Sequence, residues 1–319
     1  MHRMKTVLLA YHEIGCVGLE FLKQAGAEIR AVFTHEDDPG ENVWYGSVAQ
    51  RAKDYGLAVY MPAQINDPEW VEVIRACEPE ILFSFYYRKL VSAKILVIPP
   101  RGCYNLHGSL LPRFRGRSPT NWAILLGEKK TGVTLHEMVV KADAGVIIGR
   151  QEVDIEDDDD ARTVLMKQAE ATRALLSEVY PLLMEGRATR TVQDDSLATK
   201  FGGRRPEDGI INWNQSAESI HNLVRAVAYP WPGAFTTLRG QKCIIRRTRL
   251  YRDLSQASVC RPGAVAGATS QGVLVVCGAG CLEVLQAQVP PGPWLEGEEL
   301  KKLLVPIPGP GFSVEENRG

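Results

Sequence analysis

At 319 residues the chain is longer than one typical domain, so we expect two domains that each bury a core. Hydrophobic residues make up 45% of the sequence and charged residues 24%, as in ordinary soluble globular proteins. With 37 Lys and Arg against 38 Asp and Glu, the formal charge is −1, which excludes a protein that attracts polyanions through its overall charge.

Seven cysteines, an odd number without regular spacing, indicate reduced thiols in a cytoplasmic protein rather than a disulfide framework. Cys277 and Cys281 lie four positions apart, but no second Cys/His pair nearby would complete a zinc site. The sequence has no apolar run long enough to span a bilayer and no signal peptide. We therefore expect a cytoplasmic protein with no metal and no membrane partner.

The first half of the chain alternates short apolar runs with amphipathic stretches, which predicts an α/β fold. Helices are expected at 12–26, at 45–55 and after the start signal Asn66-Asp67-Pro68-Glu69. The turn from His12 to Gly18 lacks the G-x-G-x-x-G spacing of a dinucleotide site, which argues against NAD. Strands of a predominantly parallel sheet are expected at 5–11, where both faces would be buried, at 28–34 and, again buried, at 81–85.

The stretch 103–119 places an amide and an imidazole two positions apart. Asn105 and His107 would point to the same side of a strand, because strand side chains alternate between faces. Gly108 then begins an arginine-containing turn, and Ser118-Pro119 is a typical helix start. Alone, such a histidine is usually a core residue and such an asparagine a turn residue. The two together at the end of a strand favour a functional site.

The next part of the chain continues the α/β pattern. A strand is expected at 131–139, with Thr134 and His136 on its polar side, and another at 146–155. Between them lies a loop of small residues around Asp143. A long helix is expected to reach residue 185, and the four aspartates before it lack calcium-loop spacing. They fit the N-terminal end of that helix, where its dipole favours acidic side chains.

The second half changes character. The polar segment 187–205 has no periodicity and is expected to be a linker between a first domain, 1–186, and a second, 206–305. The second domain is expected to be a small β-barrel with one short helix before its strands and one after them, because turn signals separate its β-like runs. Residues 306–319 are expected to be a disordered tail.

The run Asn105-Leu106-His107-Gly108-Ser109-Leu110-Leu111-Pro112, followed by Arg-x-Arg-Gly, resembles the signature of the 10-formyltetrahydrofolate-dependent formyltransferases. Several other stretches, 10–16, 33–35, 45–49, 83–88, 141–145 and 224–235, resemble one group within that family. This group is the formyltransferase domains of bifunctional polymyxin-resistance enzymes, which formylate UDP-4-amino-4-deoxy-L-arabinose for lipid A modification. The similarity begins near Met4 and weakens after Arg246.

The resemblance implies a Rossmann-like catalytic domain, a C-terminal OB-like barrel and a catalytic set of Asn105, His107 and Asp143. An amine attacking a formyl carbon creates a negative oxygen, which the Asn105 amide could stabilise as a fixed donor. His107 could move the proton from the amine to the folate nitrogen. Asp143 would orient the ring of His107 and favour its charged form. No metal is required.

The resemblance also implies a binding site for the co-substrate 10-formyltetrahydrofolate. Its residues would be Lys89, Leu90, Val91, Arg117, Val139, Val140, Lys141, Ala142 and Asp143. The nearby Tyr86 and Tyr87 fall where open α/β sheets place ligands, although simple packing explains them equally well. Exposed loop charges of little energetic value remain the alternative for Arg113, Arg115 and Arg117.

The expected acceptor is UDP-4-amino-4-deoxy-L-arabinose, and the expected partners are small molecules rather than nucleic acid. A methionyl-tRNA formyltransferase is the first alternative, for which Arg246, Arg247, Arg249 and Arg252 are the best argument. A catalytically silent binding module is the second, and the intact catalytic set argues against it. No second Rossmann motif follows, so we expect a stand-alone formyltransferase or an isolated domain. The sequence leaves the oligomeric state, including a homo-oligomer, and the nucleotide contacts open.

Overall fold

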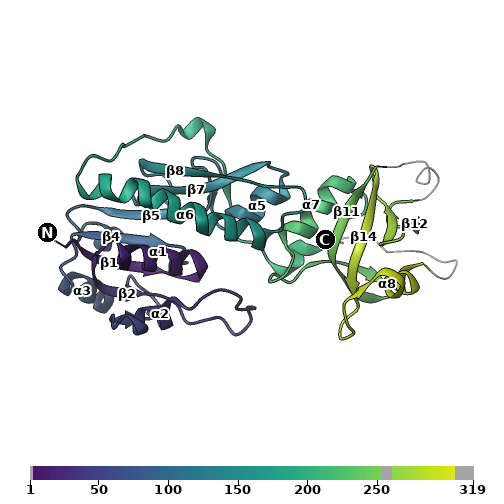
Figure 1. The fold of residues 1–319 in the computed structure, drawn as a ribbon, viewed down its shortest axis with the longest axis horizontal. Helices are drawn as coiled ribbons and strands as arrows, with labels where there is room; N and C mark the ends of the chain where they lie inside the picture. The colour runs from purple at the N-terminus through teal and green to yellow at the C-terminus, as the bar shows by residue number, and fades with distance from the viewer. Residues whose placement is uncertain (1–2, 253–260, 306–319) are drawn as a thin grey trace. The chain divides into compact units, whose positions relative to one another are not determined.

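The structure is a computed structural model that describes residues 3–252 and 261–305. The chain forms two compact units, whose course Figure 1 follows by colour. The first unit consists of Met1–Thr120, Lys130–Ile155 and Thr163–Gly203, and the second of Asn121–Lys129, Glu156–Arg162 and Arg204–Gly319. The predicted tail, 306–319, lies outside the described residues.

A seven-stranded sheet in the order β3-β2-β1-β4-β5-β7-β8 forms the centre of the first unit. Strands β1 to β5 run parallel to one another, and β7 and β8 are antiparallel to their neighbours. The prediction of an α/β fold with a predominantly parallel sheet is therefore confirmed. The strands are β1 (Lys5–Ala10), β2 (Glu28–Phe33), β3 (Val59–Tyr60), β4 (Ile81–Phe85), β5 (Cys103–His107), β7 (Lys130–Glu137) and β8 (Ile147–Asp154).

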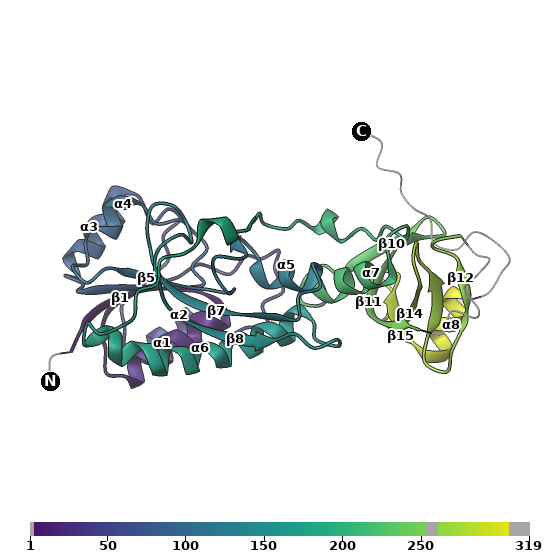
Figure 2. The ribbon, with the colours of Figure 1, turned by 90° about the horizontal axis from the view of Figure 1, so that it is seen from above.

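Helices cover both faces of this sheet. Figure 2 shows α1 and α6 on one face and α3 and α4 on the other. This two-sided cover explains why the parallel strands are apolar throughout: in β1, every residue after Lys5 is buried. The helices are α1 (His12–Gln24), α2 (Val48–Asp54), α3 (Pro68–Ala76), α4 (Ala93–Leu96), α5 (Pro119–Leu125) and α6 (Ala161–Met184).

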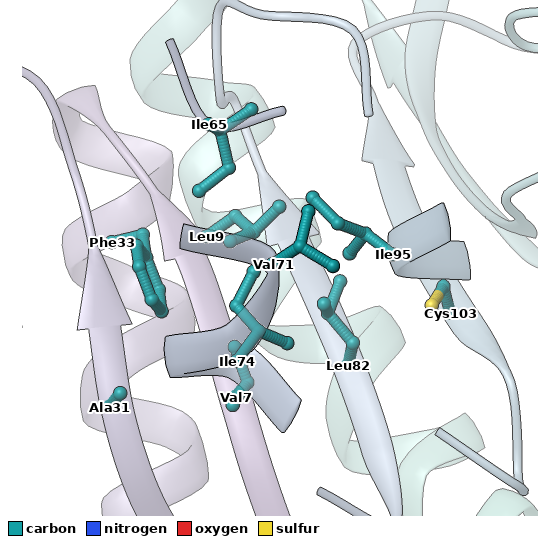
Figure 3. Packing of buried hydrophobic residues seen from close by; sticks show 10 residues of the cluster. All are labelled: Val7, Leu9, Ala31, Phe33, Ile65, Val71, Ile74, Leu82, Ile95 and Cys103. Atoms are coloured by element: carbon teal, nitrogen blue, oxygen red, sulfur yellow. The ribbon is translucent and has the colours of Figure 1, made fainter. Parts of the chain in front are cut away.

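A hydrophobic cluster joins the sheet to α3 and α4 (Figure 3). It consists of Val7, Leu9, Ala31, Phe33, Ile65, Val71, Ile74, Leu82, Ile95 and Cys103, all buried. Truncating one of its leucines to alanine would cost about 2–5 kcal/mol. Val91 and Met138 pack against the same cluster, so the chain after β4 and the chain after β7 are both anchored to this core.

The topology creates a switch point at the carboxyl edge of the sheet. The chain leaves β1 toward β2 on one side and leaves β4 toward β5 on the other. Open α/β sheets bind ligands in the crevice between connections that diverge in this way. A long loop also lies between β2 and α2, because α2 begins at Val48 and not at residue 45 as predicted. Ser47 caps the helix there, its Oγ accepting from the backbone N–H of Gln50 at 3.2 Å.

The segment 187–205, which was predicted to be a linker between the domains, is part of the first unit over most of its length. Residues up to Gly203 belong to the first unit. Thr191 exchanges two backbone hydrogen bonds with Ile147, at 2.8 and 2.9 Å, and β9 (Lys200–Phe201) pairs with β6 (Arg115–Gly116). The segment is polar because it lies on the surface of this unit and is held mainly by backbone pairing, which no sequence periodicity reveals.

Two short segments expected in the first domain, Asn121–Lys129 and Glu156–Arg162, belong instead to the second unit. Arg225 Nη1 donates to two backbone carbonyls of the second of these segments, at 2.9 and 2.8 Å. Asn121 Nδ2 donates to the carbonyl of Ala226 at 2.7 Å. These contacts join residues that are far apart in the sequence, and they tie both segments to the second unit.

The second unit is built on an antiparallel sheet in the order β10-β11-β14-β13-β12, with β15 paired to β14. The prediction of a β-rich second part is confirmed. Trp213 is fully buried in it and donates from Nε1 to Thr236 Oγ1 at 3.0 Å. The elements are β10 (Ala234–Leu238), β11 (Gln241–Tyr251), β12 (Val265–Ala268), β13 (Val273–Val276), β14 (Cys281–Gln288), β15 (Leu295–Glu296), α7 (Ala217–Ala226) and α8 (Gly297–Leu304), with a short 3₁₀ turn at Pro206–Gly209. A second 3₁₀ turn, Asp195–Leu197, belongs to the first unit.

Across residues 3–252 and 261–305, none of the helices combines the length and the apolar character that crossing a membrane would require.

Candidate active site

Asn105 and His107 both lie on β5, as the sequence predicted. β5 pairs with β7 so that Asn105 faces His136 and His107 faces Thr134 across the ladder. Tyr104 and Leu106, which alternate with them, are buried. Asn105 and His107 therefore share one face of the sheet, together with His136 on the neighbouring strand.

The amide of Asn105 is oriented by a second histidine, which sequence reasoning placed only on a polar strand face. His136 Nδ1 lies 2.7 Å from the carbonyl oxygen of Glu137, to which it donates, so its Nε2 is an acceptor. Asn105 Nδ2 donates to this Nε2 at 3.2 Å. Burial, followed by the charge of His107, lowers the pKa of His136 to about 4, so the ring is neutral near pH 7. One amide hydrogen of Asn105 is thereby fixed, and the other is available to a ligand.

The ring of His107 lies between a carbonyl and a carboxylate. Its Nε2 is 2.8 Å from the carbonyl oxygen of Phe114, to which it donates. Its Nδ1 is 3.6 Å from Asp143 Oδ1, which is close enough for an ion pair but too far for a hydrogen bond. The same carboxylate oxygen lies 3.7 Å from His136 Nε2. Asp143 thus faces both imidazoles without bonding directly to either.

Asp143 is held in place from two sides. Its Oδ2 accepts from the backbone N–H of Gly116 at 2.9 Å. Gln193 Nε2 donates to the backbone carbonyls of Asp143 and Gly145, at 2.9 and 2.7 Å. Asp143 itself has a left-handed backbone (φ +56°). This conformation costs free energy and persists because the surrounding contacts hold it. The carboxylate is consequently fixed beside His107 before any ligand binds.

Arg115 completes this support. It is buried, and it donates to Gln193 Oε1 from Nε at 3.1 Å and from Nη2 at 2.7 Å. Its Nη2 also pairs with Asp195 Oδ1 at 2.8 Å. The next residue, Gly116, has φ +102°, and a Cβ there would lie 2.2 Å from the carbonyl oxygen of Phe201. Only glycine fits this position, and the turn is built around it.

The residues predicted to bind folate lie on two loops and one turn. After β4, the Asn66 side chain accepts from the Ser92 N–H and donates to the Leu90 carbonyl, at 2.8 and 2.9 Å. Lys89 Nζ donates to the carbonyls of Pro62 and Ala63. Leu90 is 75% exposed.

After β7, Val139 and Val140 are exposed, Val140 to 81%. Lys141 Nζ pairs with Asp195 Oδ2 at 2.7 Å, so it joins the group around Arg115. Arg117 is exposed on the turn beside Gly203. Exposed aliphatic side chains thus lie on both loops, Leu90 on the first and Val139 and Val140 on the second.

Sequence reasoning missed the contributions of His136, Arg115, Gln193 and Phe114. His136 had a usable signal, because a strand adjacent to Asn105 would bring it opposite the amide. Gln193 had none, since it lies in a segment without periodicity and meets Asp143 only through the fold. No group of three or more His, Cys, Asp and Glu side chains in the described ranges, 3–252 and 261–305, could hold a metal ion.

A cavity of about 380 Å³ lies away from this site. Its lining includes Ile81 at the start of β4, Gly102 just before β5, and Arg190, which pairs with Glu137. None of the predicted catalytic or folate residues lines it. The imidazoles of His107 and His136 and the carboxylate of Asp143 converge beside β5 and not in this cavity.

Two family models match the chain. A model described as "Formyl transferase" matches residues 17–180, which is more than half of the sequence. A second, described as "Formyl transferase, C-terminal domain", matches residues 204–303. Together they cover both compact units.

Solved structures of similar fold include WlaRD, a sugar 3N-formyltransferase crystallised with dTDP and 5-N-formyl-THF (TM-score 0.67, 19% identity, 92% of this chain and 100% of that one). Another is an N-formyltransferase from Helicobacter canadensis in complex with folinic acid and dTDP-3-aminofucose (TM-score 0.66, 18% identity, 88% of this chain and 99% of that one). A third is the methionyl-tRNA formyltransferase from Clostridium thermocellum (TM-score 0.54, 17% identity, 77% of this chain and 92% of that one). At these identities the likeness establishes the fold.

Proposed function

The chain belongs to the formyl transferase family, and we propose that it transfers a formyl group from 10-formyltetrahydrofolate to the primary amine of a nucleotide-linked amino sugar. The observation that carries this proposal is the convergence of Asn105, His107 and Asp143 at one end of β5. An oriented amide donor, an imidazole and a fixed carboxylate are the groups that acyl transfer to an amine needs.

In the proposed reaction, the acceptor nitrogen attacks the formyl carbon and forms a new C–N bond. The carbonyl oxygen becomes negative, and the free hydrogen of Asn105 Nδ2 stabilises it. The bond between the formyl carbon and folate N10 then breaks. The amine loses one proton and N10 gains one, so the reaction needs a group that both accepts and donates protons.

His107 serves as that group. Nε2 is engaged by the Phe114 carbonyl, so a proton can be taken up at Nδ1, where Asp143 stabilises the imidazolium from 3.6 Å. Because Gly116 and Gln193 already hold Asp143, the carboxylate need not reorganise as charge develops. Asn105 gains in the same way from His136.

The formyl donor is supported by the exposed apolar side chains of Leu90, Val139 and Val140, which lie on the loops after β4 and after β7. Arg117 supplies a positive charge suited to the glutamate tail of a folate. Two structures of similar fold, WlaRD and the Helicobacter canadensis enzyme, were crystallised with formylated folates.

For the acceptor we propose UDP-4-amino-4-deoxy-L-arabinose. The resemblance of the stretches 45–49 and 224–235 to enzymes for that sugar supports it, as does the near-neutral charge of the chain. The two sugar formyltransferases of similar fold were crystallised with dTDP or a dTDP-linked 3-amino sugar, so these are the acceptors to compare it with.

The test offers 10-formyltetrahydrofolate with three acceptors, namely UDP-4-amino-4-deoxy-L-arabinose, dTDP-3-aminofucose and charged initiator tRNA, and follows the mass gain of one formyl group. We expect turnover of the UDP-sugar, with a KM that depends only weakly on salt, because it carries two phosphates. Turnover of the dTDP-sugar instead would change the sugar and keep the reaction. Turnover of tRNA alone, falling steeply with salt, would overturn the acceptor class.

A further inference from the structure

A group of aromatic rings lies at the switch point of the sheet, outside the catalytic set. We define the His12 cluster as Tyr11, His12, Trp44, Tyr45 and Tyr86. Its members come from the end of β1, the start of α1, the loop before α2 and the residue after β4. These are the segments that border the crevice where α/β sheets bind ligands.

His12 lies at the centre of this cluster. Its ring centroid is 3.9 Å from that of Tyr45, 5.0 Å from that of Trp44 and 5.8 Å from that of Tyr86. The surrounding polar groups are paired: Tyr11 Oη donates to Asp37 Oδ1 at 2.9 Å and lies 2.7 Å from Tyr45 Oη. Glu13 Oε2 accepts from the N–H of Gly46 at 2.9 Å, which holds the loop against α1.

Two features of His12 oppose folding. Its backbone is left-handed (φ +67°), which costs free energy in any residue with a Cβ. The residue is only 8% exposed, and its buried Nδ1 has no hydrogen-bond partner among the described residues. A buried polar atom without a partner costs about 1–3 kcal/mol.

His35 provides a contrast within the same neighbourhood. Its Nε2 accepts from the N–H of Arg88 at 3.1 Å, and its ring stacks on that of Tyr87 at 4.2 Å. Burial lowers the pKa of both histidines, that of His12 to about 3 and that of His35 to about 4. Both rings are therefore neutral near pH 7. They differ in that His35 has its partner within the chain and His12 does not.

We call the segment 105–119, together with Asp143, which accepts from the N–H of Gly116, the catalytic turn, after the role proposed for it. The His12 cluster is adjacent to this turn. Tyr86 packs so closely on Gly108 that a Cβ on this glycine would lie 2.6 Å from Tyr86 Oη. Gly108 directly follows His107. A ligand whose amine lies at Asn105 and His107 would therefore extend toward Tyr86, whose ring centroid lies 5.8 Å from that of His12.

We propose that His12 is a specificity-determining residue that hydrogen-bonds a hydroxyl on the ring of the acceptor sugar, through the ring nitrogen that the protein leaves unpartnered. This rests on the proposed function, because it assumes a sugar acceptor. A neutral imidazole suits a hydroxyl, which can both donate and accept, better than it suits a phosphate. The aromatic rings around it suit the apolar face of a sugar and exclude competing water.

The experiment compares wild type with His12→Phe, using the UDP- or dTDP-linked amino sugar that wild type formylates and analogues in which each ring hydroxyl is replaced by hydrogen. For wild type, one analogue should have kcat/KM reduced roughly 10- to 100-fold, the effect of leaving one buried group unpaired. His12→Phe should show a similar reduction with the intact sugar and no further reduction with that analogue. Such non-additivity identifies a direct contact.

The matched control is His35→Phe. It removes an acceptor that the Arg88 N–H uses, so it should lower Tm while changing the KM for the sugar less than threefold. His12→Phe removes an unpartnered atom, so its Tm should equal or exceed that of wild type. His12→Asn, which tolerates the left-handed backbone, keeps the test usable if the phenylalanine variant does not fold.

Equal kcat/KM of wild type and both His12 variants for the intact sugar would overturn the assignment and leave the proposed function standing. The same holds if the deoxy analogues reduce turnover equally in wild type and variants. If wild type formylates no amino sugar, the proposed function fails and this inference fails with it. Unchanged kinetics with the folate substrate are expected throughout, because the His12 cluster includes none of the folate residues.

Discussion

The catalytic turn and the His12 cluster lie next to each other on the same sheet but are completed in different ways. In the turn, Asn105 is bonded to His136, His107 to Phe114 and Asp143 to Gly116. In the cluster, the central imidazole keeps a buried nitrogen without a partner in the described chain. The turn is thus assembled by the protein alone, whereas the cluster remains incomplete.

This difference matches what each region would have to do. Groups that stabilise a developing charge work best when they are already oriented, since reorienting them during the reaction costs free energy. A group that selects a ligand works in the opposite way, because its unmet hydrogen bond penalises every ligand that cannot form it. On these proposals, the same sheet edge would combine a preorganised site for chemistry with an adjacent site for recognition.

The largest expected effect comes from breaking the turn itself. Asn105→Ala removes the donor to the negative oxygen and should lower kcat about 100- to 1000-fold. His107→Ala and Asp143→Ala should each abolish most turnover while the protein remains folded. Because the three groups act as a unit, double variants should be little worse than the worst single one. The measurement is single-turnover formylation with the accepted sugar, and near-normal turnover by His107→Ala would refute the mechanism.

The second effect is the pH dependence of folding stability that arises from the buried His12 of the cluster. Burial lowers the pKa of His12 to about 3, against about 6.5 in the unfolded chain. Between these values the unfolded state binds more protons, so stability is fully present above pH 6.5 and is lost as the pH falls. Wild type should lose roughly 2 kcal/mol through this group between pH 7 and pH 5.

Urea unfolding at several pH values measures this effect. His12→Phe has no such group, so its stability should fall less than that of wild type over the same range. His136, whose pKa burial lowers to about 4, remains in both proteins and contributes equally to both. Parallel pH curves for the two proteins would mean that His12 is not buried as a neutral ring in solution.

Much of the catalytic turn could be predicted from the sequence. Alternation along a strand placed Asn105 and His107 on one face, and the family resemblance assigned Asp143 to the same site. What could not be predicted is how Asp143 is held. Gln193 reaches it from the segment 187–203, which pairs with the first unit by backbone bonds, and such pairing leaves no signature in a polar sequence.

The His12 cluster could not be predicted from the sequence for a similar reason. Its rings come from segments more than thirty residues apart, and sequence reasoning extended α2 back over Tyr45. In the structure α2 begins only at Val48, because Ser47 caps its N-terminus, and Trp44 and Tyr45 therefore lie on the preceding loop. A missing hydrogen-bond partner, such as that of His12, is a property of the packed structure alone.

A third prediction refines the comparison from inside the turn, through the positioning residue His136. His136→Phe leaves the Asn105 amide free to rotate, so kcat should fall about tenfold while the KM values for both substrates stay the same. His136→Gln supplies an amide oxygen as acceptor in place of Nε2 and should recover part of this loss. A change in KM alone, or no recovery by glutamine, would indicate a purely structural role for His136.

The smallest expected effect distinguishes two neighbouring arginines of the turn. Arg115 is buried against Gln193 and Asp195, whereas Arg117 is exposed. If Arg117 meets the glutamate tail of the folate, the pair is a solvent-exposed ion pair of about 0.2–1 kcal/mol. Arg117→Ala should therefore raise the KM for 10-formyltetrahydrofolate up to about fivefold, more at low salt than at high salt, with Tm unchanged. Arg115→Ala is the control: it leaves the Gln193 oxygen without its donor and loosens the support of Asp143, so Tm and kcat should both fall. An unchanged folate KM in Arg117→Ala at low salt would return Arg117 to the ordinary surface charges.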